Sequence, residues 1–166
     1  MNIRKPVMSE LDNILRIYAC AREQMKKNGN PSQWGDDKPK LQTIIQDIKN
    51  EYSYIIENEG KICGVFALLF GEEPSYRIIE GKWANDKPYG TIHRVASDGS
   101  VKGILKECLD FCEKQAGNIR IDTHEDNKIM QHLLGKYGYI KCGIIHVEDG
   151  SPRIAYQKCT LDIGRP

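Results

Sequence analysis

The sequence lacks the features that mark membrane, secreted and nucleic-acid-binding proteins. No apolar run approaches the roughly 18 residues that cross a bilayer, and the segment from Met1 to Pro6 has no apolar core of the kind found in signal peptides. The 24 basic and 23 acidic residues nearly cancel, so no large field attracts nucleic acid or an anionic membrane. We therefore expect a cytoplasmic protein whose ligand is a small molecule, with no nucleic acid and no membrane among its partners.

Motifs for metal binding are missing as well, because the chain has no C-x-x-C pair and no H-E-x-x-H sequence. The six cysteines are scattered among apolar neighbours in predicted helices and strands, which favours reduced core thiols over disulfides. Cys108 and Cys112 lie four residues apart on one predicted helix face, a spacing that holds a metal only if two further ligands converge from elsewhere. We predict no metal site.

The remaining pattern alternates between strand-like and helix-like periodicity, without repeats or low-complexity segments. One predicted helix runs from a cap at Ser9 to about Asn28, a second covers Leu41 to Ile48, a third starts at Val101, and a fourth runs from a cap at Asp126 to Gly138. Asn58-Glu59-Gly60 and Glu148-Asp149-Gly150-Ser151 have hairpin chemistry. The predicted strands are 2–7, 52–57, 61–70, 92–96, 118–123, 139–147 and 153–160.

The most informative stretch is Gly90 to Ala116, GTIHRVASDGSVKGILKECLDFCEKQA, where a β-branched strand runs through a polar turn into a helix. Backbone N–H groups at the start of that helix, with the side chains of Lys102 and Lys106, favour a pyrophosphate, and Gly103 lets it approach the main chain. The alternative is an ordinary connection between a strand and a helix, with lysines on its surface.

The element order βααβββαβαββ, with phosphate-binding features after the fourth strand, resembles the GNAT superfamily of acyl-CoA-dependent N-acetyltransferases over nearly the whole chain. The resemblance rests on Val95-Ala96-Ser97 as the signature strand end, Val101-Lys102-Gly103-Ile104 as the pyrophosphate loop, Asn127 as the residue that opens the next helix, and Lys136-Tyr137-Gly138-Tyr139 as its end.

The resemblance implies an α/β fold, namely a GNAT-like mixed, mostly antiparallel sheet of about seven strands with about four helices, splayed after strand four. The splay would leave backbone groups near Val95 and Ser97 able to pair with pantetheine like an extra strand. A single GNAT-like N-acetyltransferase domain would cover residues 1–166. Because exposed C-terminal strands often pair between subunits in this fold, a homodimer is a further prediction.

The implied activity is transfer of an acetyl group from acetyl-CoA, the co-substrate, to an amine by direct attack in a ternary complex. A backbone N–H at Val95 or Ala96 would stabilise the charge that develops on the attacked carbonyl. Two alternatives stay open, an acyl-CoA-binding sensor and a non-catalytic GNAT-like interaction module. The cofactor contacts that the resemblance implies are Val95, Ala96, Ser97, Val101, Lys102, Gly103, Ile104, Leu105, Lys106 and Asn127.

The chain departs from the family pattern at three positions. The family loop reads Q/R-x-x-G-x-G/A, whereas Ser100 and Leu105 occupy its first and last positions here, and Leu105 needs room that a glycine does not. Many members place a tyrosine seven residues after the helix-opening asparagine, where this chain has Leu134. Either Tyr137, one turn away, protonates the departing thiolate, or the thiolate leaves without a dedicated acid and Tyr137 packs in the core.

A base or a water relay is also expected, because a primary amine with a pKa near 10 is protonated at neutral pH. His93 is the first candidate, since it precedes Val95 by two residues on the signature strand and would share its face. Its alternative role is a hydrogen bond within the sheet. His124, or Glu72 and Glu73 acting on a water molecule, are the other candidates.

Substrate selectivity is predicted for aromatic side chains in two irregular segments that the family places over the acceptor cleft. Their faces suit an apolar or cationic small-molecule amine. The alternative is that they only fix long loops to the body of the protein. One of these segments, 71–89, is predicted to be a mobile, aromatic-rich loop. The four residues are Trp34, Tyr76, Trp83 and Tyr89.

Overall fold

Helices and strands follow the chain in the predicted order, with one added strand. The structure, a computed structural model, describes residues 1–160. The helices are α1 (Leu11–Lys27), α2 (Leu41–Lys49), α3 (Ile104–Ala116) and α4 (Lys128–Lys136), with 3₁₀ turns η1 (Met8–Glu10) and η2 (Pro74–Tyr76). The strands are β1 (Asn2–Arg4), β2 (Ser53–Asn58), β3 (Lys61–Phe70), β4 (Glu80–Gly81), β5 (Gly90–Ser97), β6 (Asn118–Thr123), β7 (Ile140–His146) and β8 (Pro152–Cys159).

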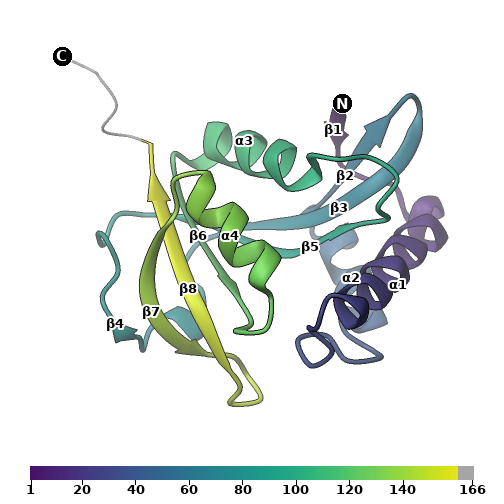
Figure 1. The fold of residues 1–166 in the computed structure, drawn as a ribbon. Helices are drawn as coiled ribbons and strands as arrows, with labels where there is room; N and C mark the ends of the chain where they lie inside the picture. The colour runs from purple at the N-terminus through teal and green to yellow at the C-terminus, as the bar shows by residue number, and fades with distance from the viewer. Residues whose placement is uncertain (161–166) are drawn as a thin grey trace. The chain divides into compact units, whose positions relative to one another are not determined.

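The strands of the described residues form one eight-stranded sheet in the order β1-β2-β3-β5-β6-β8-β7-β4 (Figure 1). β1 with β2, β2 with β3, β6 with β8, β8 with β7 and β7 with β4 pair antiparallel. β5 pairs with β6 in parallel over Gly90↔Ile119 and Thr91↔Arg120, and then continues to Ser97. This confirms the predicted mixed sheet, which has one strand more than expected. Two compact units make up the chain, Met1–Leu68 with His93–Phe111, and Leu69–Ile92 with the residues from Cys112 onward.

In the first unit, the β2–β3 hairpin has two different faces because side chains alternate along a strand. On one face Tyr54 stacks on its partner Phe66, with ring centroids 5.4 Å apart, and both rings contact Phe111 of α3. Figure 1 shows α3 on one side of the hairpin and α1 and α2 on the other. The second face buries a cluster with these two helices, made of Ile14, Ile17, Tyr18, Ala21, Ile44, Ile48, Ile55, Val65 and Ala96.

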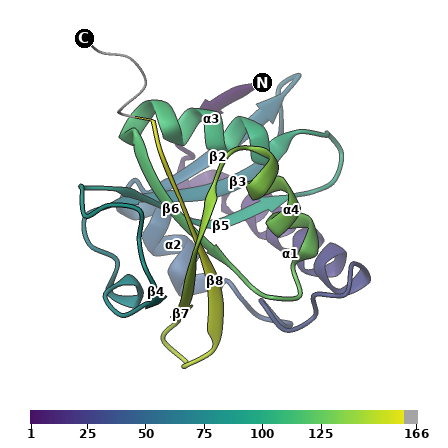
Figure 2. The same cartoon turned by 60° about the vertical axis from the view of Figure 1, so that its left-hand side comes forward.

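In the second unit, β6 pairs with β8 from Asn118↔Cys159 to Thr123↔Ile154, and β8 pairs with β7. The short strand β4 lies within the predicted loop 71–89 and adds to the outer edge of β7 (Figure 2). A Cβ atom on Gly81 or Gly143 would lie 2.2 Å from a backbone carbonyl oxygen of the facing strand, so this pairing requires glycine in both strands. The loop prediction was therefore wrong at Glu80–Gly81.

Two predicted helix caps were also wrong. Ser9 lies inside η1, and α1 begins after Glu10 without a side-chain hydrogen bond to its first turn. The N-cap of α4 is Asn127 instead of Asp126, and the Asn127 Oδ1 accepts a hydrogen bond from the Met130 N–H. Adjacent capping residues compete for the same orphan donors, and the turn of the backbone decides which one reaches them.

All six cysteines are free thiols; Cys63, Cys108 and Cys112 are buried, and Cys20, Cys142 and Cys159 are half-buried. Within residues 1–160, no helix is both long and apolar enough to cross a membrane.

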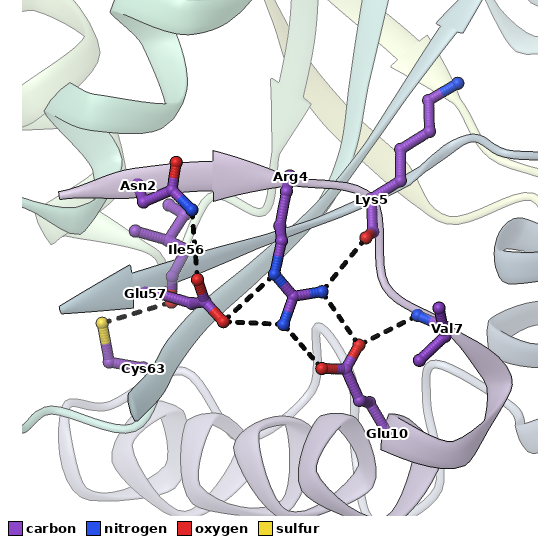
Figure 3. Close-up of polar contacts among 8 residues, drawn as sticks. All are labelled: Asn2, Arg4, Lys5, Val7, Glu10, Ile56, Glu57 and Cys63. Atoms are coloured by element: carbon purple, nitrogen blue, oxygen red, sulfur yellow. Dashed lines mark hydrogen bonds and ion pairs between the residues drawn. The ribbon is translucent and has the colours of Figure 1, made fainter. Parts of the chain in front are cut away.

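Arg4 ties β1 to β2 and to η1, as Figure 3 shows. Its guanidinium donates to both carboxylate oxygens of Glu10 and, through Nε and Nη2, to Oε1 of Glu57. Oε2 of Glu10 also accepts the Val7 N–H at 2.9 Å. These hydrogen bonds from Arg4 hold the pKa values of Glu10 and Glu57 below their usual range.

Replacing Arg4 should therefore make the stability of the protein change less as the pH falls. The stabilisation linked to Glu10 and Glu57 is present above their ordinary pKa of about 4.3 and is lost as the pH falls through the lowered values. We expect Arg4→Gln to lower the melting temperature at pH 7, and the difference from wild type to shrink at pH 3. Thermal unfolding at both pH values checks this. Lys5→Gln, next to Arg4, is the matched control and should show little effect; a pH-independent deficit in Arg4→Gln would contradict the prediction.

Candidate functional site

The strand β5 contains a left-handed residue, Arg94, whose φ is 54°. Such a conformation costs a non-glycine residue roughly 1–2 kcal/mol, so other contacts must hold it. The Nε and Nη2 atoms of Arg94 donate to the two carboxylate oxygens of Asp47 on α2, each at 2.8 Å. The Asp47 side chain is only 8% exposed, which makes this a largely buried bidentate pair.

Tyr18 of α1 holds the same residue from its carbonyl side. Its hydroxyl donates to the Arg94 carbonyl oxygen at 3.1 Å, and its ring packs edge-on against Trp34 at a centroid distance of 5.7 Å. Burial raises the pKa of Tyr18 because the phenolate would be poorly solvated, so its hydroxyl stays protonated and remains a donor. Arg94 is thus fixed by two helices at once.

The loop after β5 is anchored by Asp98. Its backbone N–H donates to the Cys63 carbonyl at 3.1 Å, and its carboxylate accepts the Ser100 N–H at 3.0 Å, the Ser100 hydroxyl at 2.6 Å and Nη1 of Arg16 at 3.2 Å. Burial opposes ionisation of this carboxyl, yet the hydrogen bonds from Ser100 and Arg16 outweigh it and lower the pKa of Asp98. The predicted turn residues therefore build an ordered loop.

The helix α3 begins at Ile104, later than the predicted start at Val101, because the turn continues through Gly103 with φ 84°. Ile104 is buried, and its Cγ2 lies 2.8 Å from the position that a Cβ atom on Gly64 of β3 would take. At Gly103 a Cβ atom would meet no described heavy atom within 4 Å. The helix start is thus packed closely against β3 at Ile104 and open at Gly103.

The two lysines of the predicted phosphate site differ in their surroundings. Lys102 is exposed on the turn, whereas the ammonium group of Lys106 contacts the carboxylate of Asp110 one helical turn later. Leu105 is half-buried beside them. Lys102 therefore presents the more accessible charge at the helix start.

The left-handed Arg94 also affects the argument for His93. His93 and Val95 are both half-buried, and Ala96 is buried in the cluster with α1 and α2. A two-residue spacing places side chains on one face only while the strand is regular, and Arg94 interrupts it between His93 and Val95. The role of His93 as a base stays a prediction without that support.

In the second unit, Trp83 and Tyr89 enclose the side chain of Arg120. The guanidinium carbon lies 4.0 Å from each ring centroid, and Nη2 donates to the Asn85 carbonyl at 2.8 Å. Burial lowers the pKa of Arg120 because it disfavours the charged form. These contacts agree with the alternative in which the aromatic residues fix the loop to the body of the protein. A substrate role for Trp83 and Tyr89 stays a prediction.

Tyr76 is buried in the same unit and its hydroxyl donates to Oδ2 of Asp122 at 2.7 Å. Burial, followed by the charge of Asp122, raises the pKa of Tyr76. Its carbonyl accepts the Trp83 indole N–H at 3.1 Å, and the Tyr89 hydroxyl accepts the Glu73 N–H at 2.9 Å. The aromatic residues of the loop 71–89 are therefore joined to the protein by several hydrogen bonds.

The helix α4 carries the remaining predicted residues. Asn127 is its N-cap, and Tyr137 its C-cap, with the Tyr137 carbonyl accepting Nζ of Lys158 at 2.9 Å. Leu134, at the position of the family tyrosine, is fully buried. Nδ1 of His124 accepts the Asp126 N–H at 3.0 Å.

The first unit thus brings together His93, the strand end Val95–Ser97, the loop through Gly103, the start of α3 and Trp34, whereas Tyr76, Trp83, Tyr89, Asn127 and Tyr137 lie in the second unit. Sequence reasoning missed Tyr18, Asp47 and Arg94. One signal for Asp47 exists, because a carboxylate three residues after Ile44 and one before Ile48 interrupts the apolar stripe of α2. Within residues 1–160, no group of three or more His, Cys, Asp and Glu residues is arranged to hold a metal ion.

The structure resembles solved acetyltransferases, although the sequence matches no protein-family model and no curated protein. A GNAT-family acetyltransferase from Streptococcus agalactiae is 34% identical, with 95% of this chain and 94% of that chain covered and a TM-score of 0.86. One from Listeria monocytogenes is 22% identical over 95% and 94% of the two chains, with a TM-score of 0.71. A Salmonella typhimurium protein solved with its cofactor acetyl-CoA is 14% identical over 99% and 96%, with a TM-score of 0.60. The last two show similarity of fold alone.

The close approach of Gly64 to Ile104 predicts a coupled effect of two substitutions. Gly64→Ala should destabilise the protein by about 1–3 kcal/mol, because the new methyl group overlaps Cγ2 of Ile104. In the Ile104→Ala background the same change should cost clearly less, since that methyl group is gone. Urea unfolding of the two single variants and the double variant measures this coupling. Additive effects would show that Gly64 and Ile104 do not constrain each other.

Proposed function

Because the chain belongs to the GNAT family of acetyltransferases, we propose that it transfers the acetyl group of acetyl-CoA to the amine nitrogen of a small molecule, by direct attack in a ternary complex. The observation that carries the proposal is the geometry of β5, where the left-handed Arg94 is followed by an anchored loop and a helix start that is open at Gly103. The proposal is supported because the strand is irregular at Arg94 and its loop leads to a helix N-terminus, which is a feature suited to an anion.

The pyrophosphate of the cofactor would bind at the start of α3. The first N–H groups of a helix have no partner within it, and the helix dipole favours negative charge there. Lys102 adds an exposed positive charge, and the space beside Gly103 admits a phosphate close to the main chain. Asp98 does not oppose this strongly, since its charge is directed to Ser100 and Arg16.

The pantetheine arm and the thioester would follow the strand end Val95–Ser97. In the reaction, a base or a water relay would first take a proton from the ammonium form of the acceptor. The lone pair of the neutral amine would then attack the thioester carbonyl carbon, the carbon–sulfur bond would break, and CoA would leave as a thiolate. The backbone N–H of Val95 or Ala96 would stabilise the negative charge on the carbonyl oxygen. The nitrogen then loses its proton to a base or to water.

The proposal includes a base that deprotonates the amine and an acid that protonates the thiolate, and more than one residue is a candidate for each role. His93 lies on β5 next to Arg94, which makes it the nearest imidazole in sequence to the proposed oxyanion donor. His124 already accepts a hydrogen bond at Nδ1, so only its Nε2 could face a substrate, and then as a donor when neutral. With Leu134 fully buried, either Tyr137 protonates the thiolate or it leaves without a dedicated acid.

A small-molecule acceptor is favoured by the balanced charge of the chain and by the aromatic side chains of its irregular segments. Trp34 is the member of this group in the first unit, where it is half-buried against Tyr18. Trp83 and Tyr89, which are half-buried, would contribute through the parts of their rings that Arg120 leaves accessible, whereas Tyr76 is buried and offers no comparable surface. The sensor alternative is supported by Leu105 and Leu134, which replace residues of the family pattern.

A calorimetric titration with acetyl-CoA, and with dephospho-CoA for comparison, tests the proposal together with an assay for free CoA thiol in the presence of a panel of amines. Saturable binding and thiol release that depends on one amine class would support an acetyltransferase. Binding without turnover for any amine would support the sensor, and no binding at millimolar acetyl-CoA would overturn both.

Two glycines with the same backbone conformation allow a sharper test of the loop. Gly103 and Gly150 both have φ 84°, and a methyl group on either would meet no described atom within 4 Å, but Gly150 lies in the turn between β7 and β8. Alanine should cause similar backbone strain at both, about 1 kcal/mol. Only Gly103→Ala should weaken acetyl-CoA binding, about tenfold or more, because its methyl group occupies the space proposed for the phosphate. Calorimetry on both variants checks this, and equal affinities would remove Gly103 from the site.

A further inference from the structure

The peptide group between Arg94 and Val95 is held in one orientation by contacts from two helices. The Tyr18 hydroxyl of α1 donates to the Arg94 carbonyl, and Asp47 of α2 accepts two hydrogen bonds from the Arg94 guanidinium. Tyr18 and Asp47 are 2% and 6% exposed as whole residues. All these residues lie in the first unit.

The orientation of this peptide group determines where the Val95 N–H points. In a planar trans peptide the carbonyl and the N–H are directed to opposite sides of the chain. Because the Arg94 carbonyl points to the Tyr18 hydroxyl, the Val95 N–H points away from it. A rotation of the Arg94 backbone to an ordinary strand conformation would redirect both groups.

We propose that Tyr18 and Asp47 are positioning residues for the acyl thioester: Tyr18 aims the Val95 N–H at the thioester oxygen, and Asp47 keeps Arg94 in the left-handed conformation that this aim requires. The inference rests on the proposed function. Neither residue touches the reacting atoms. Both act through the backbone of Arg94.

The bidentate pair explains how the conformation persists. An arginine offers no intrinsic preference for positive φ, and its strain must be offset by contacts available only in that conformation. The Asp47 carboxylate accepts two charge-assisted hydrogen bonds in a largely buried setting, where the loss of one partner would leave an uncompensated charge. A regular strand at Arg94 would break the pair.

If the Val95 N–H is turned away from the thioester oxygen, the rate of the chemical step should fall more than the affinity for the cofactor. An N–H that stabilises the developing oxyanion acts mainly in the transition state, so its displacement lowers kcat. The loop of Asp98 and the start of α3 would be left in place, and with them the phosphate contacts. We therefore expect Tyr18→Phe to lower kcat about tenfold while the Kd of CoA, which lacks the acyl group, stays within about twofold of wild type.

Tyr139→Phe is the matched control, because it also removes a buried tyrosine hydroxyl from a hydrogen bond, here to Glu113 at 3.1 Å, in the second unit. It should leave kcat unchanged. Tyr18→Phe keeps the ring that packs on Trp34, so it should fold. An unchanged kcat in Tyr18→Phe, or an equal loss in Tyr139→Phe, would overturn the positioning role.

Glycine at position 94 tests the part played by Asp47. Glycine adopts a positive φ without strain, so the conformation no longer needs the ion pair. We expect Asp47→Asn to lower kcat about tenfold in the wild-type background and less than about twofold in the Arg94→Gly background. An equal loss in both backgrounds would show that Asp47 acts by another route and overturn its assignment.

A ligand-free measurement separates this inference from the proposed function. The ¹⁵N–¹H resonance of Val95 should shift in Tyr18→Phe and stay in place in Tyr139→Phe, because only the first change releases the Arg94 carbonyl. A wild-type protein without turnover would overturn the acetyltransferase proposal and the catalytic role of this peptide. Turnover with an unshifted Val95 resonance and unchanged kcat would overturn the positioning role alone.

Discussion

The buried ion pair between Arg94 and Asp47 is the interaction on which the functional part of the first unit depends. The pair is formed with Arg94 in the left-handed conformation, so a largely buried carboxylate accompanies the irregular backbone of β5. Tyr18 then adds a direct hydrogen bond to the bent peptide. The Arg94 carbonyl therefore accepts a side-chain hydrogen bond from α1, at the position where the backbone of β5 is irregular.

The loop and helix that follow extend this constraint. Asp98 anchors the turn to Cys63 and Arg16, and Ile104 packs so closely on β3 that a Cβ atom at position 64 would lie 2.8 Å from its Cγ2. With these contacts on one side, the space beside Gly103 remains open on the other. Acetyl-CoA binding, as proposed, would use that space together with the dipole of α3.

In the second unit, the aromatic residues of the loop 71–89 pack against the interior of the protein. The mixture of aromatic, proline, glycine and charged residues predicted a mobile loop, and the family resemblance implied that its aromatics contact a substrate. In the structure, Trp83 and Tyr89 stack on Arg120, and Gln157 and Asn118 bind the loop through Asn85. An arginine in the middle of β6 needs such partners, because a buried guanidinium without them would be destabilising. The same side chains that suit ligand recognition also satisfy the interior of the protein.

The amino-acid sequence by itself determined the order of the helices and of every strand except β4, the turn at Glu59-Gly60, and the polar turn that leads to α3, because periodicity and turn chemistry act over a few residues. It also indicated the fold family through the motif around Val95 and Gly103. Only the tertiary structure decided that Arg94 is left-handed, that Asp47 and Tyr18 hold it, and that Arg120 occupies the space between Trp83 and Tyr89. These features depend on partners that lie far apart along the chain, 47 residues in the case of Asp47 and Arg94, and such pairs are chosen by packing and not by local spacing.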